Sequence, residues 1–515
     1  MNAITLGIDL ATASARCVAL DTETGSAVAT ASASLPAPVH SAGGVSRQRS
    51  DYARVAFTVI SDVCRDLGSA AGRVRALSVT GTSGTVVACA GDGSPVGDAR
   101  LYDDDSSGAD VTALGLVGAS SLGRMLSLQR ELRSSGGRGP DLMLSTVDVV
   151  AAALVGTVVA SDTSHALKAG IDIGRRTWPV AAMAALGLPT TGLPDLVPPG
   201  HVLGIASSPT ATALGLPVGV LVVAGMTDGC TAQLGAGAVR PGDTLGVLGT
   251  TLVLKGVSPV ELTTSDGAVY SHLSPSGDFW PGGASNSGAG VLDAEFAGRD
   301  LGHLDRAAAE RGPSTVVRYP LARVGERFPV ADPTLPSVSS GEPVDEVDAY
   351  RAVLEGVAFV ERLGVETLSG LGIRPIRHTL TGGASRSATW NTIRATVLSP
   401  ALTGPTGQVL VDGALTQATT QQSGSRVVHA TTAGSATGAA ILAAHSLSHQ
   451  GSPAALHETV ARLVPTPVPV HPDPSQAVQL EQSYTAFLAL LDASTRPVQM
   501  TSSAEQSAGR RAHHV

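Results

Sequence analysis

The stretch GVLVVAGMTDGCTAQLGAGAVRPGDTLGVLGTTLVLKG, residues 219–256, places Asp228 after an apolar run, in a turn of small residues, before two further apolar runs. The N-terminal stretch ITLGIDLATASARCVALD (Ile4–Asp21) places Asp9 in a similar position. We interpret each stretch as strand, tight turn and strand. A buried strand that delivers a carboxylate beside backbone N–H groups suits a phosphate and its metal ion. Two such units indicate a duplicated nucleotide-binding fold with its site between the halves.

Length and charge exclude several classes of protein. With 515 residues the chain is too long for one hydrophobic core, so two domains are expected. Its 34 basic and 43 acidic residues leave a formal net charge of −9, which argues against a nucleic acid or an anionic membrane as a partner. The longest apolar stretch, 149–160, is too short to span a bilayer. We therefore expect neither a nucleic acid nor a membrane partner.

The cysteine and lysine contents are also informative. The four cysteines form no CxxC pair, which favours reduced thiols in a cytoplasmic protein over a disulfide scaffold. The N-terminus lacks the basic segment of a signal peptide, and no HExxH motif indicates a zinc hydrolase. Lysine occurs only at Lys168 and Lys255. Codon usage is the simple explanation, yet a rare lysine in an arginine-rich chain merits attention.

The order of predicted elements repeats in the two halves of the chain. Strands followed by helix–strand units occur in both. We predict an α/β fold of two actin-like (ribonuclease-H-like) ATPase domains that flank a catalytic cleft, at residues 1–240 and 241–493, with a flexible tail at 494–515. The predicted elements are the strands 4–10, 16–21, 27–34, 74–80, 85–90, 218–224, 244–248, 252–256 and 377–380 and the helices 53–67, 123–133, 146–154, 349–368, 438–445 and 479–491.

Familiar nucleotide signatures are missing, since neither GxxxxGK[ST] nor a helix-opening GxGxxG occurs. A series of other motifs, in order over most of the chain, resembles the FGGY carbohydrate kinases. The resemblance implies transfer of the γ-phosphoryl group of ATP to a sugar hydroxyl, with the sugar and the base in the N-terminal domain and the nucleotide in the C-terminal one. Besides the segment around Asp228, the motifs are GIDLATASAR (Gly7–Arg16), VTGTSGTVVACAGDGSPV (Val79–Val96), SDTSHALKAGID (Ser161–Asp172), GTT (Gly249–Thr251), WPGGASNSG (Trp280–Gly288), YPLARVGERFP (Tyr319–Pro329), AVLEGVAFVERL (Ala352–Leu363) and TGGASRSATWN (Thr381–Asn391).

The resemblance assigns roles to the two aspartates. Asp228 would be the general base that accepts the proton of the attacking hydroxyl. The alternative is that Asp228 only caps a turn or a helix N-terminus. Asp9 would hold Mg²⁺ through water, and the alternative for Asp9 is a structural Asx turn. ATP and Mg²⁺ are therefore the expected cofactors.

The ATP-binding residues implied by the resemblance lie in three turns. Threonines in the two hairpin turns would donate hydroxyl and backbone hydrogen bonds to phosphate oxygens, although a threonine in a hairpin is often merely structural. A glycine pair that opens a helix would lie at the adenosine and α-phosphate, or would simply pack helix against strand. Asn391 would lie near the base. The full set is Thr12, Arg16, Gly249, Thr250, Thr251, Gly382, Gly383, Ala384 and Asn391.

The sugar-binding residues implied by the resemblance carry hydroxyl, amide and carboxylate groups, which can orient sugar hydroxyls. A solvated acidic loop is the alternative for 103–105, and Lys168 would pair with Asp162, line the pocket or lie on the surface. GTSGT resembles the D-ribulose kinase branch, so we expect D-ribulose, with D-xylulose or another ketose or polyol as alternatives. The set is Thr82, Ser83, Tyr102, Asp103, Asp104 and Asn286.

Three departures from the family pattern keep other functions open. Ala11 stands where the phosphate turn usually has glycine, and Ser106 stands where an arginine often follows the acidic loop. Residues 404–430, rich in Thr, Gln and Gly, resemble an inserted polar surface loop. A catalytically weak sugar-sensing homologue and an actin-like or chaperone-like ATPase are therefore alternatives. Small-molecule sugar and ATP are the expected partners, and a homodimer is left open.

Overall fold

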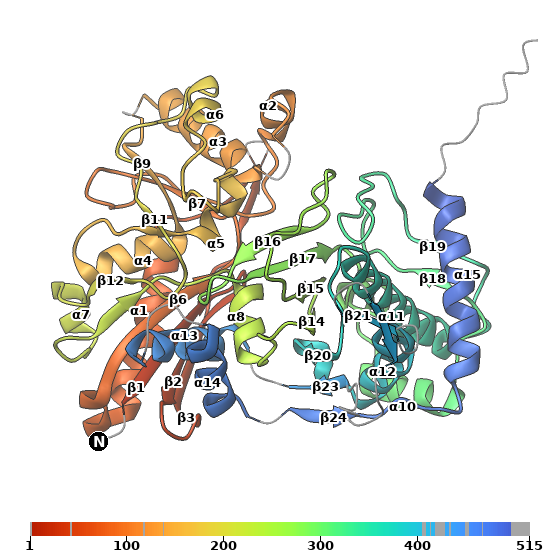
Figure 1. The fold of residues 1–515 in the computed structure, drawn as a ribbon. Helices are drawn as coiled ribbons and strands as arrows, with labels where there is room; N and C mark the ends of the chain where they lie inside the picture. Colours follow the sequence, from red (N-terminus) through yellow and green to blue (C-terminus); the bar gives the residue numbers. More distant parts are fainter. Residues whose placement is uncertain are drawn as a thin grey trace, which may run out of the picture.

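The computed structural model describes residues 3–41, 44–116, 119–136, 139–403, 408–411, 414–417, 428–431, 434–448, 453–465 and 467–495. The first half of the chain is built on a six-stranded sheet (Figure 1). Across this sheet the strands are β12 (Val202–Ile205), β13 (Leu221–Val223), β6 (Val74–Gly81), β1 (Ile4–Leu10), β2 (Ser14–Asp21) and β3 (Ala27–Ser34). β1 pairs with β2 antiparallel and with β6 parallel, and β6 pairs with β13 parallel. β1 is buried along almost its whole length because it lies in the middle of this sheet, whereas β3 at the edge alternates in burial.

A seven-stranded sheet forms the second half. Across it the strands are β16 (Tyr270–Leu273), β17 (Phe279–Ser285), β15 (Leu252–Gly256), β14 (Asp243–Leu248), β20 (Arg377–Thr381), β23 (Val428–Ala430) and β24 (Val468–Val470). β14 pairs with β15 antiparallel and with β20 parallel, and β20 pairs with β23 parallel.

The two sheets follow the same plan. In the first sheet β1, β2 and β3 form an antiparallel meander that starts at the central strand β1, and β6 and β13 follow in parallel on the other side of β1. In the second sheet β14, β15 and β17 form the meander, and β20 and β23 follow in parallel on the other side of β14. In each, a further strand closes the sheet antiparallel, β12 in the first and β24 in the second. This repeat confirms the predicted duplicated actin-like fold. The predicted strands and helices are present, with ends that differ by a few residues.

A smaller five-stranded sheet in the first half sits beside the first sheet. It consists of β4 (Val39–Ser41), β5 (Gly44–Arg47), β8 (Ala99–Arg100), β7 (Val86–Cys89) and β9 (Leu142–Ser145). The helical elements of this half are α1 (Asp51–Leu67), η1 (Gly68–Arg73), α2 (Gly108–Ala113), α3 (Ser120–Ser134), α4 (Thr146–Val155), α5 (Thr163–Ala166), η2 (Leu167–Ala169), α6 (Val180–Ala185), α7 (Pro209–Ala213) and α8 (Asp228–Gly235). α1 presents Tyr52, Val55, Val59 and Val63 to the core of the first sheet, at helical spacing.

Most helices of the second half lie around its sheet, with α15 on the outside (Figure 1), whereas two of them pack on the first half. None of the helices in the described ranges is both long and apolar enough to cross a membrane. The helical elements of the second half are α9 (Gly290–Glu295), α10 (Leu301–Arg311), α11 (Glu346–Gly370), η3 (Gly383–Arg386), α12 (Ala388–Thr403), α13 (Ser435–Ser448), α14 (Pro453–Leu463) and α15 (Ala477–Thr495). Short paired strands complete the fold: β10 (Ser161–Asp162) with β11 (Leu196–Val197), β18 (Arg318–Tyr319) with β19 (Val338–Ser339), and β21 (Gln408–Val411) with β22 (Ala414–Gln417).

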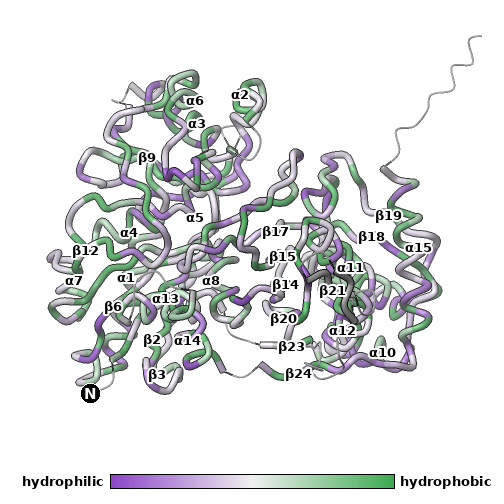
Figure 2. The backbone as a smooth tube through the Cα atoms, in the orientation of Figure 1, coloured by the Kyte–Doolittle hydropathy of each residue, from purple (hydrophilic) through white to green (hydrophobic). Residues whose placement is uncertain are grey.

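The largely apolar helix α13 returns from the second half to pack on the first sheet and on α8 (Figures 1 and 2). The approach is close, because a Cβ built on Gly7 would fall 1.9 Å from the carbonyl oxygen of Ala436. α14 follows it, and Arg462 donates a hydrogen bond to the carbonyl oxygen of Thr22. The strands of the first sheet all precede residue 240 and those of the second all follow it, whereas α13 and α14 come from the second half and pack on the first.

The predicted loop 404–430 differs from the expectation where it is described. Residues 408–411 and 414–417 form an antiparallel pair, and 428–430 form β23 inside the second sheet. The remainder of this loop, and 496–515 of the predicted tail, lie outside the described residues. α15 extends to Thr495, so helix replaces the first two residues of that tail.

Candidate functional site

The two aspartates lie where the first sheet meets α8. Asp9 is near the C-terminal end of β1, opposite Arg16 in the β1–β2 register. Asp228 is the first residue of α8, and the preceding Thr227 forms a parallel bridge with Gly81 at the end of β6. Adjacent parallel strands end at one edge of the sheet, so both carboxylates are carried to that edge.

The two carboxylates lie close enough for the charge of Asp228 to act on the pKa of Asp9. Burial and then the charge of Asp228 raise this pKa to about 7, against the opposing effects of Arg16 and a hydrogen bond from Ser435. Oδ1 of Asp9 is buried and has no hydrogen-bond partner among the described residues. An orphaned carboxylate oxygen of this kind fits a hydrated Mg²⁺ ion. The described residues contain no cluster of three or more His, Cys, Asp or Glu that could hold a metal, which suits an ion bound mainly by phosphates.

Cationic groups surround the carboxylate of Asp228. Burial is the largest effect and leaves the pKa of this carboxylate above its ordinary value, although the N–H of Gly229, which donates to Oδ1 at 2.7 Å, and the charges of His165, Lys168 and Lys255 oppose the rise. These groups favour the ionised carboxylate that a general base needs at neutral pH.

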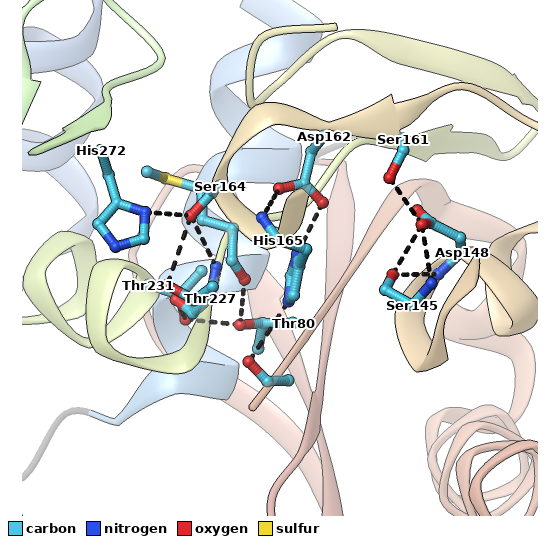
Figure 3. Close-up of polar contacts among 12 residues, drawn as sticks. Thr80, Ser145, Asp148, Ser161, Asp162, Ser164, His165, Thr227, Thr231 and His272 are labelled. Carbon is cyan, nitrogen blue, oxygen red and sulfur yellow. Dashed lines mark hydrogen bonds and ion pairs between the residues drawn. The ribbon is translucent and has the colours of Figure 1, made fainter. Parts of the chain in front are cut away.

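A buried polar network fixes the residue before Asp228 (Figure 3). The backbone N–H of Thr227 donates to Oγ of Ser164 at 3.1 Å, and Ser164 shares a hydrogen bond of 2.9 Å with Nδ1 of His272. Thr80 donates to the carbonyl oxygen of Met226 at 2.6 Å. The start of α8 is thereby tied to β6, α5 and β16, so the two halves jointly position the carboxylate.

Asp162 pairs with His165 rather than with Lys168. Oδ2 of Asp162 lies 2.7 Å from Nδ1 of His165 (Figure 3). Burial alone would lower the pKa of His165, but the charge and hydrogen bond of Asp162 outweigh burial and raise it. The suggested pairing of Lys168 with Asp162 is therefore wrong, and Lys168 lines a cavity instead.

The predicted phosphate residues of the second half gather around one hairpin. Gly249, Thr250 and Thr251 form the turn between β14 and β15. Gly382 has a φ of 93°, and a Cβ there would fall 2.4 Å from the carbonyl oxygen of Leu248, so only glycine fits beside this hairpin.

The predicted adenosine loop is fastened by Asn391. Gly383 and Ala384 lie in η3, and Gly383 has open space around its missing side chain, with only the end of Arg386 within 4 Å. The amide of Asn391 donates to the carbonyl oxygen of Ser385 at 2.7 Å, and its Oδ1 is buried without a partner among the described residues. Asn391 thus holds the loop and keeps one free acceptor.

The first phosphate turn is unstrained. The N–H of Ala11 donates to the carbonyl oxygen of Ser14 at 3.0 Å, and the carbonyl oxygen of Thr12 accepts from Arg47 at 2.7 Å. Among described residues the non-glycine with positive φ is Arg176, so Ala11 has an ordinary backbone conformation. Alanine at this position therefore carries no cost of a positive φ. Arg16 is exposed at this edge and acts on Asp9 through its charge.

A cavity of about 1000 Å³ lies between the halves, and Tyr102 and Asp103 of the predicted sugar set line it. Asp104 is turned away from it: the carboxylate accepts from the N–H of Val45 at 2.6 Å and from the hydroxyl of Ser106 at 2.7 Å. Asp104 is thus engaged in holding its own loop.

The remaining predicted sugar residues border other groups. Thr82 shares a hydrogen bond of 3.0 Å with Thr85, and Oγ of Ser83 is buried without a partner among the described residues. The amide of Asn286 donates to the carbonyl oxygen of Gly325 at 2.7 Å. None of these three side chains lines the described cavity.

The structure adds residues that the sequence did not assign. Arg124 on α3 donates to the carbonyl oxygens of Tyr102, Asp104 and Gly84. It therefore joins the two loops that carry the predicted sugar residues, and it supplies an arginine to a region where position 106 has serine. Tyr270 and Arg327 also line the cavity. Only the rarity of lysine could have directed attention to the cationic side of this site.

Comparisons with known proteins agree with this architecture. The sequence model of the N-terminal domain of the FGGY family of carbohydrate kinases matches residues 139–235, and that of the C-terminal domain matches 247–447. The chain is 30% identical to a xylulose kinase of Escherichia coli strain K12 over 258 residues, 48% of this chain and 53% of that protein. It is 28% identical to a ribulokinase of Mycolicibacterium smegmatis over 208 residues, 36% of each. The chain thus spans about half or less of the length of these curated relatives.

A solved structure covers far more of the chain. The crystal structure of xylulose kinase from Rhodospirillum rubrum superposes with a TM-score of 0.77 at 25% identity, over 95% of this chain and 98% of that one. The two family matches together extend over more than half of the chain, and they fall on both halves of the duplicated fold. The chain therefore belongs to the FGGY family of carbohydrate kinases.

Proposed function

We propose that the protein is an ATP-dependent carbohydrate kinase that phosphorylates a hydroxyl of a ketopentose. The observation that carries this proposal is the pair of carboxylates, Asp9 and Asp228, which β1 and the start of α8 bring to one sheet edge that adjoins the second half of the chain. A chaperone-like ATPase has no need of a base there, nor of a polar cavity lined from both halves.

Asp228 is the general base in this proposal. The acceptor oxygen forms a bond to the γ-phosphorus, the bond from that phosphorus to the β,γ-bridging oxygen breaks, and the hydroxyl proton passes to Asp228 as ADP leaves. Lys168, Lys255 and His165 help to keep the base ionised beforehand. The ties from Ser164 and Thr80 to the start of α8 hold the carboxylate in place.

ATP would lie between the two hairpin turns. Thr12 of the first turn and Gly249, Thr250 and Thr251 of the second would donate hydrogen bonds to phosphate oxygens, with Arg16 nearby. Gly382, Gly383 and Ala384 would approach the adenosine side, with Asn391 holding that loop. Asp9 would hold a hydrated Mg²⁺, which when bound neutralises phosphate charge.

The sequence resemblance favours D-ribulose as the acceptor, with D-xylulose as the neighbouring alternative. Tyr102 and Asp103 are the predicted sugar residues that line the cavity. The four cysteines are buried free thiols, which supports a reducing compartment such as the cytoplasm. A homodimer stays a prediction.

A panel of acceptors tests the function. ADP release is measured with Mg²⁺-ATP and each of several ketopentoses, polyols and sugar acids, and the phosphorylated product is identified by mass spectrometry. We expect release that depends on one class of acceptor, with one phosphate per ADP in the product. Release that no acceptor stimulates would overturn the kinase in favour of an ATPase. Sugar binding without any turnover would identify a sensing homologue.

A further inference from the structure

Both lysines of this chain lie close to the proposed acceptor cavity, Lys168 in its lining and Lys255 behind the Tyr270 ring, although they come from different halves. Lys168 lies in η2 of the first half and lines the cavity. Lys255 lies on β15 of the second half and is 2% exposed. Its Nζ is 5.1 Å from the centroid of the Tyr270 ring, and Tyr270 lines the same cavity. The chain has 34 basic residues, so convergence of its only two lysines on one tyrosine beside the base is a specific arrangement.

The ammonium group of Lys255 lies over the Tyr270 ring but has no hydrogen-bond partner among the described residues. Its Nζ is buried and makes no hydrogen bond with any described residue. A buried ammonium group without a partner is costly, so a site that retains one is suited to a ligand that supplies the opposite charge. Asp228 is the carboxylate whose pKa both lysines lower, and it is needed as the base.

The acidic residues of the cavity do not neutralise the lysines. Glu326 accepts hydrogen bonds from Ser285 at 2.6 Å and from Tyr319 at 2.9 Å, and Asp266 accepts from Thr264 at 2.6 Å. Asp103 and Asp105 are exposed. The buried side of the cavity therefore carries the uncompensated positive charge, and the exposed side carries carboxylates suited to hydroxyl groups.

The positive charges also shift the pKa values of neighbouring side chains. Burial alone would raise the pKa of Tyr270, yet Lys168, Lys255 and Arg327 outweigh burial and lower it. Burial and then the two lysines also hold the pKa of His272 well below its ordinary value.

We propose that the acceptor is a polyhydroxy acid, an open-chain sugar acid whose carboxylate binds beside Lys168, Lys255 and Tyr270. The proposal rests on the proposed kinase activity and replaces its neutral ketopentose by an acid. The carboxylate takes no part in the transfer: a hydroxyl oxygen still bonds to the γ-phosphorus, its proton still goes to Asp228, and ADP still leaves. The exposed Asp103 and Asp105 disfavour a doubly charged sugar phosphate and suit hydroxyl groups of the acid.

Matched acceptors test the proposal without any mutation. Initial rates are measured for D-gluconate against D-glucitol and for D-ribonate against D-ribitol, pairs that differ by a carboxylate in place of a CH₂OH group, with D-ribulose and D-xylulose alongside. We expect kcat/KM for the better aldonate to exceed that of its alditol and of both ketoses by roughly 10- to 100-fold, the range for a charge-assisted contact. Equal or better use of the neutral acceptors would overturn the acid and leave the kinase intact. Absence of acceptor-dependent turnover throughout the panel would overturn both.

Lys255→Met and Lys168→Met locate the recognition. Each variant should lose roughly 10- to 100-fold more in kcat/KM for the aldonate than for the neutral acceptors, mainly through KM, with KM for ATP little changed. A smaller loss of kcat that is common to all acceptors is expected as well, because both lysines help to keep Asp228 ionised. Lys255→Arg should recover part of the loss, and Arg299→Met, which removes an exposed cation paired with Glu346, serves as the matched control. A loss of kcat/KM by the same factor for acidic and neutral acceptors would show that the lysines serve only the base or the transferring phosphoryl group, and would overturn the proposal. Melting temperatures show whether the variants are folded. If a variant is not folded, the rates of the wild-type protein with the matched acceptor pairs decide whether the acceptor is an acid.

Discussion

Asp228 illustrates how surroundings decide the role of a single residue. As the first residue of α8 it could serve only to satisfy backbone donors, yet among the described residues the group that donates a hydrogen bond to its carboxylate is the adjacent N–H of Gly229. The cap position itself belongs to Thr227. With His165, Lys168 and Lys255 acting on its charge, the carboxylate is better placed for proton transfer than for capping.

Replacing Asp228 by Asn should separate chemistry from binding. The amide keeps the shape and the Gly229 contact but cannot take a proton, so we expect kcat to fall on the order of 10²–10⁴-fold. The affinity for an ATP analogue, measured by titration calorimetry, should stay within a few-fold of wild type. Asn391→Asp is a useful comparison, since it should alter nucleotide affinity first. Turnover of Asp228→Asn near the wild-type rate would contradict the assignment of the base.

The backbone at Ala11 allows a second prediction. Because Ala11 has an ordinary φ, Ala11→Gly relieves no strain and only adds freedom to the unfolded chain. We expect a loss of roughly 0.4–1 kcal/mol in the free energy of unfolding, measured with denaturant, and an unchanged KM for ATP. A KM for ATP lowered several-fold would mean that the Ala11 methyl obstructs the phosphate turn.

At the scale of elements, local patterns predicted more than long-range ones. The meander β1–β3 and the hairpin β14–β15 were predictable because apolar runs and small-residue turns are local signals. The return of α13 to the first sheet was not, since its apolar sequence suits either sheet equally well. β23 was likewise hidden in a Thr- and Gln-rich segment, and its place beside β20 depends on pairing between distant residues.

The contact between α13 and α8 depends on glycine. A Cβ on Gly438 would fall 1.7 Å from the carbonyl oxygen of Thr231, a backbone atom that cannot turn aside. Gly438→Ala should therefore lower the free energy of unfolding by roughly 1–3 kcal/mol or more, and should lower kcat because α8 carries Asp228. Gly434→Ala is the matched control, because nothing lies within 4 Å of the added methyl group. Equal melting temperatures for the two variants would contradict the close packing.

A buried charge cluster should make stability depend on pH. Arg394 lies 2.6 Å from both oxygens of Glu361, and Nε2 of His378 lies 3.1 Å from Oε1. Burial alone would raise the pKa of Glu361, but Arg394 and His378 outweigh burial and lower it from 4.5 to about 2. The cluster joins α11, α12 and β20.

Because the pKa is lower in the folded state, the stabilisation by Glu361 is present above pH 4.5 and is lost as the pH falls toward 2. The shift corresponds to a contribution on the order of 3 kcal/mol. Relative to Glu361→Gln, wild type should show an advantage in denaturant unfolding that is constant above about pH 5 and shrinks below it. The exposed Glu310→Gln serves as the control. An advantage that does not change between pH 6 and pH 3 would contradict the lowered pKa.

At the scale of the whole molecule, the site exists only where the halves meet. Asp9 and Asp228 were predictable from the sequence because each ends a local motif. The convergence of Lys168 and Lys255 on Tyr270 was not, because it depends on the placement of one half against the other and on which face of β15 looks toward α8. A Cβ on Gly229 would contact Val253 at 3.5 Å and Lys255 at 4.0 Å, so that face of β15 packs directly against the start of α8.

This arrangement predicts that ligands draw the halves together. The proposed base lies in the first half, the second phosphate turn lies in the second, and the cavity takes its lining from both. Closure would bring the acceptor to the γ-phosphoryl group and exclude the water that would otherwise hydrolyse ATP. Small-angle scattering with acceptor and a non-hydrolysable ATP analogue should therefore give a smaller radius of gyration than the free protein, and either ligand alone should give a smaller change.

Because α13 and α14 belong to the second half in sequence but pack on the first, we expect them to move with the first half, and hydrogen exchange in α13 should stay unchanged on closure. A constant radius of gyration with both ligands demonstrably bound would show that the halves are already closed in the free protein.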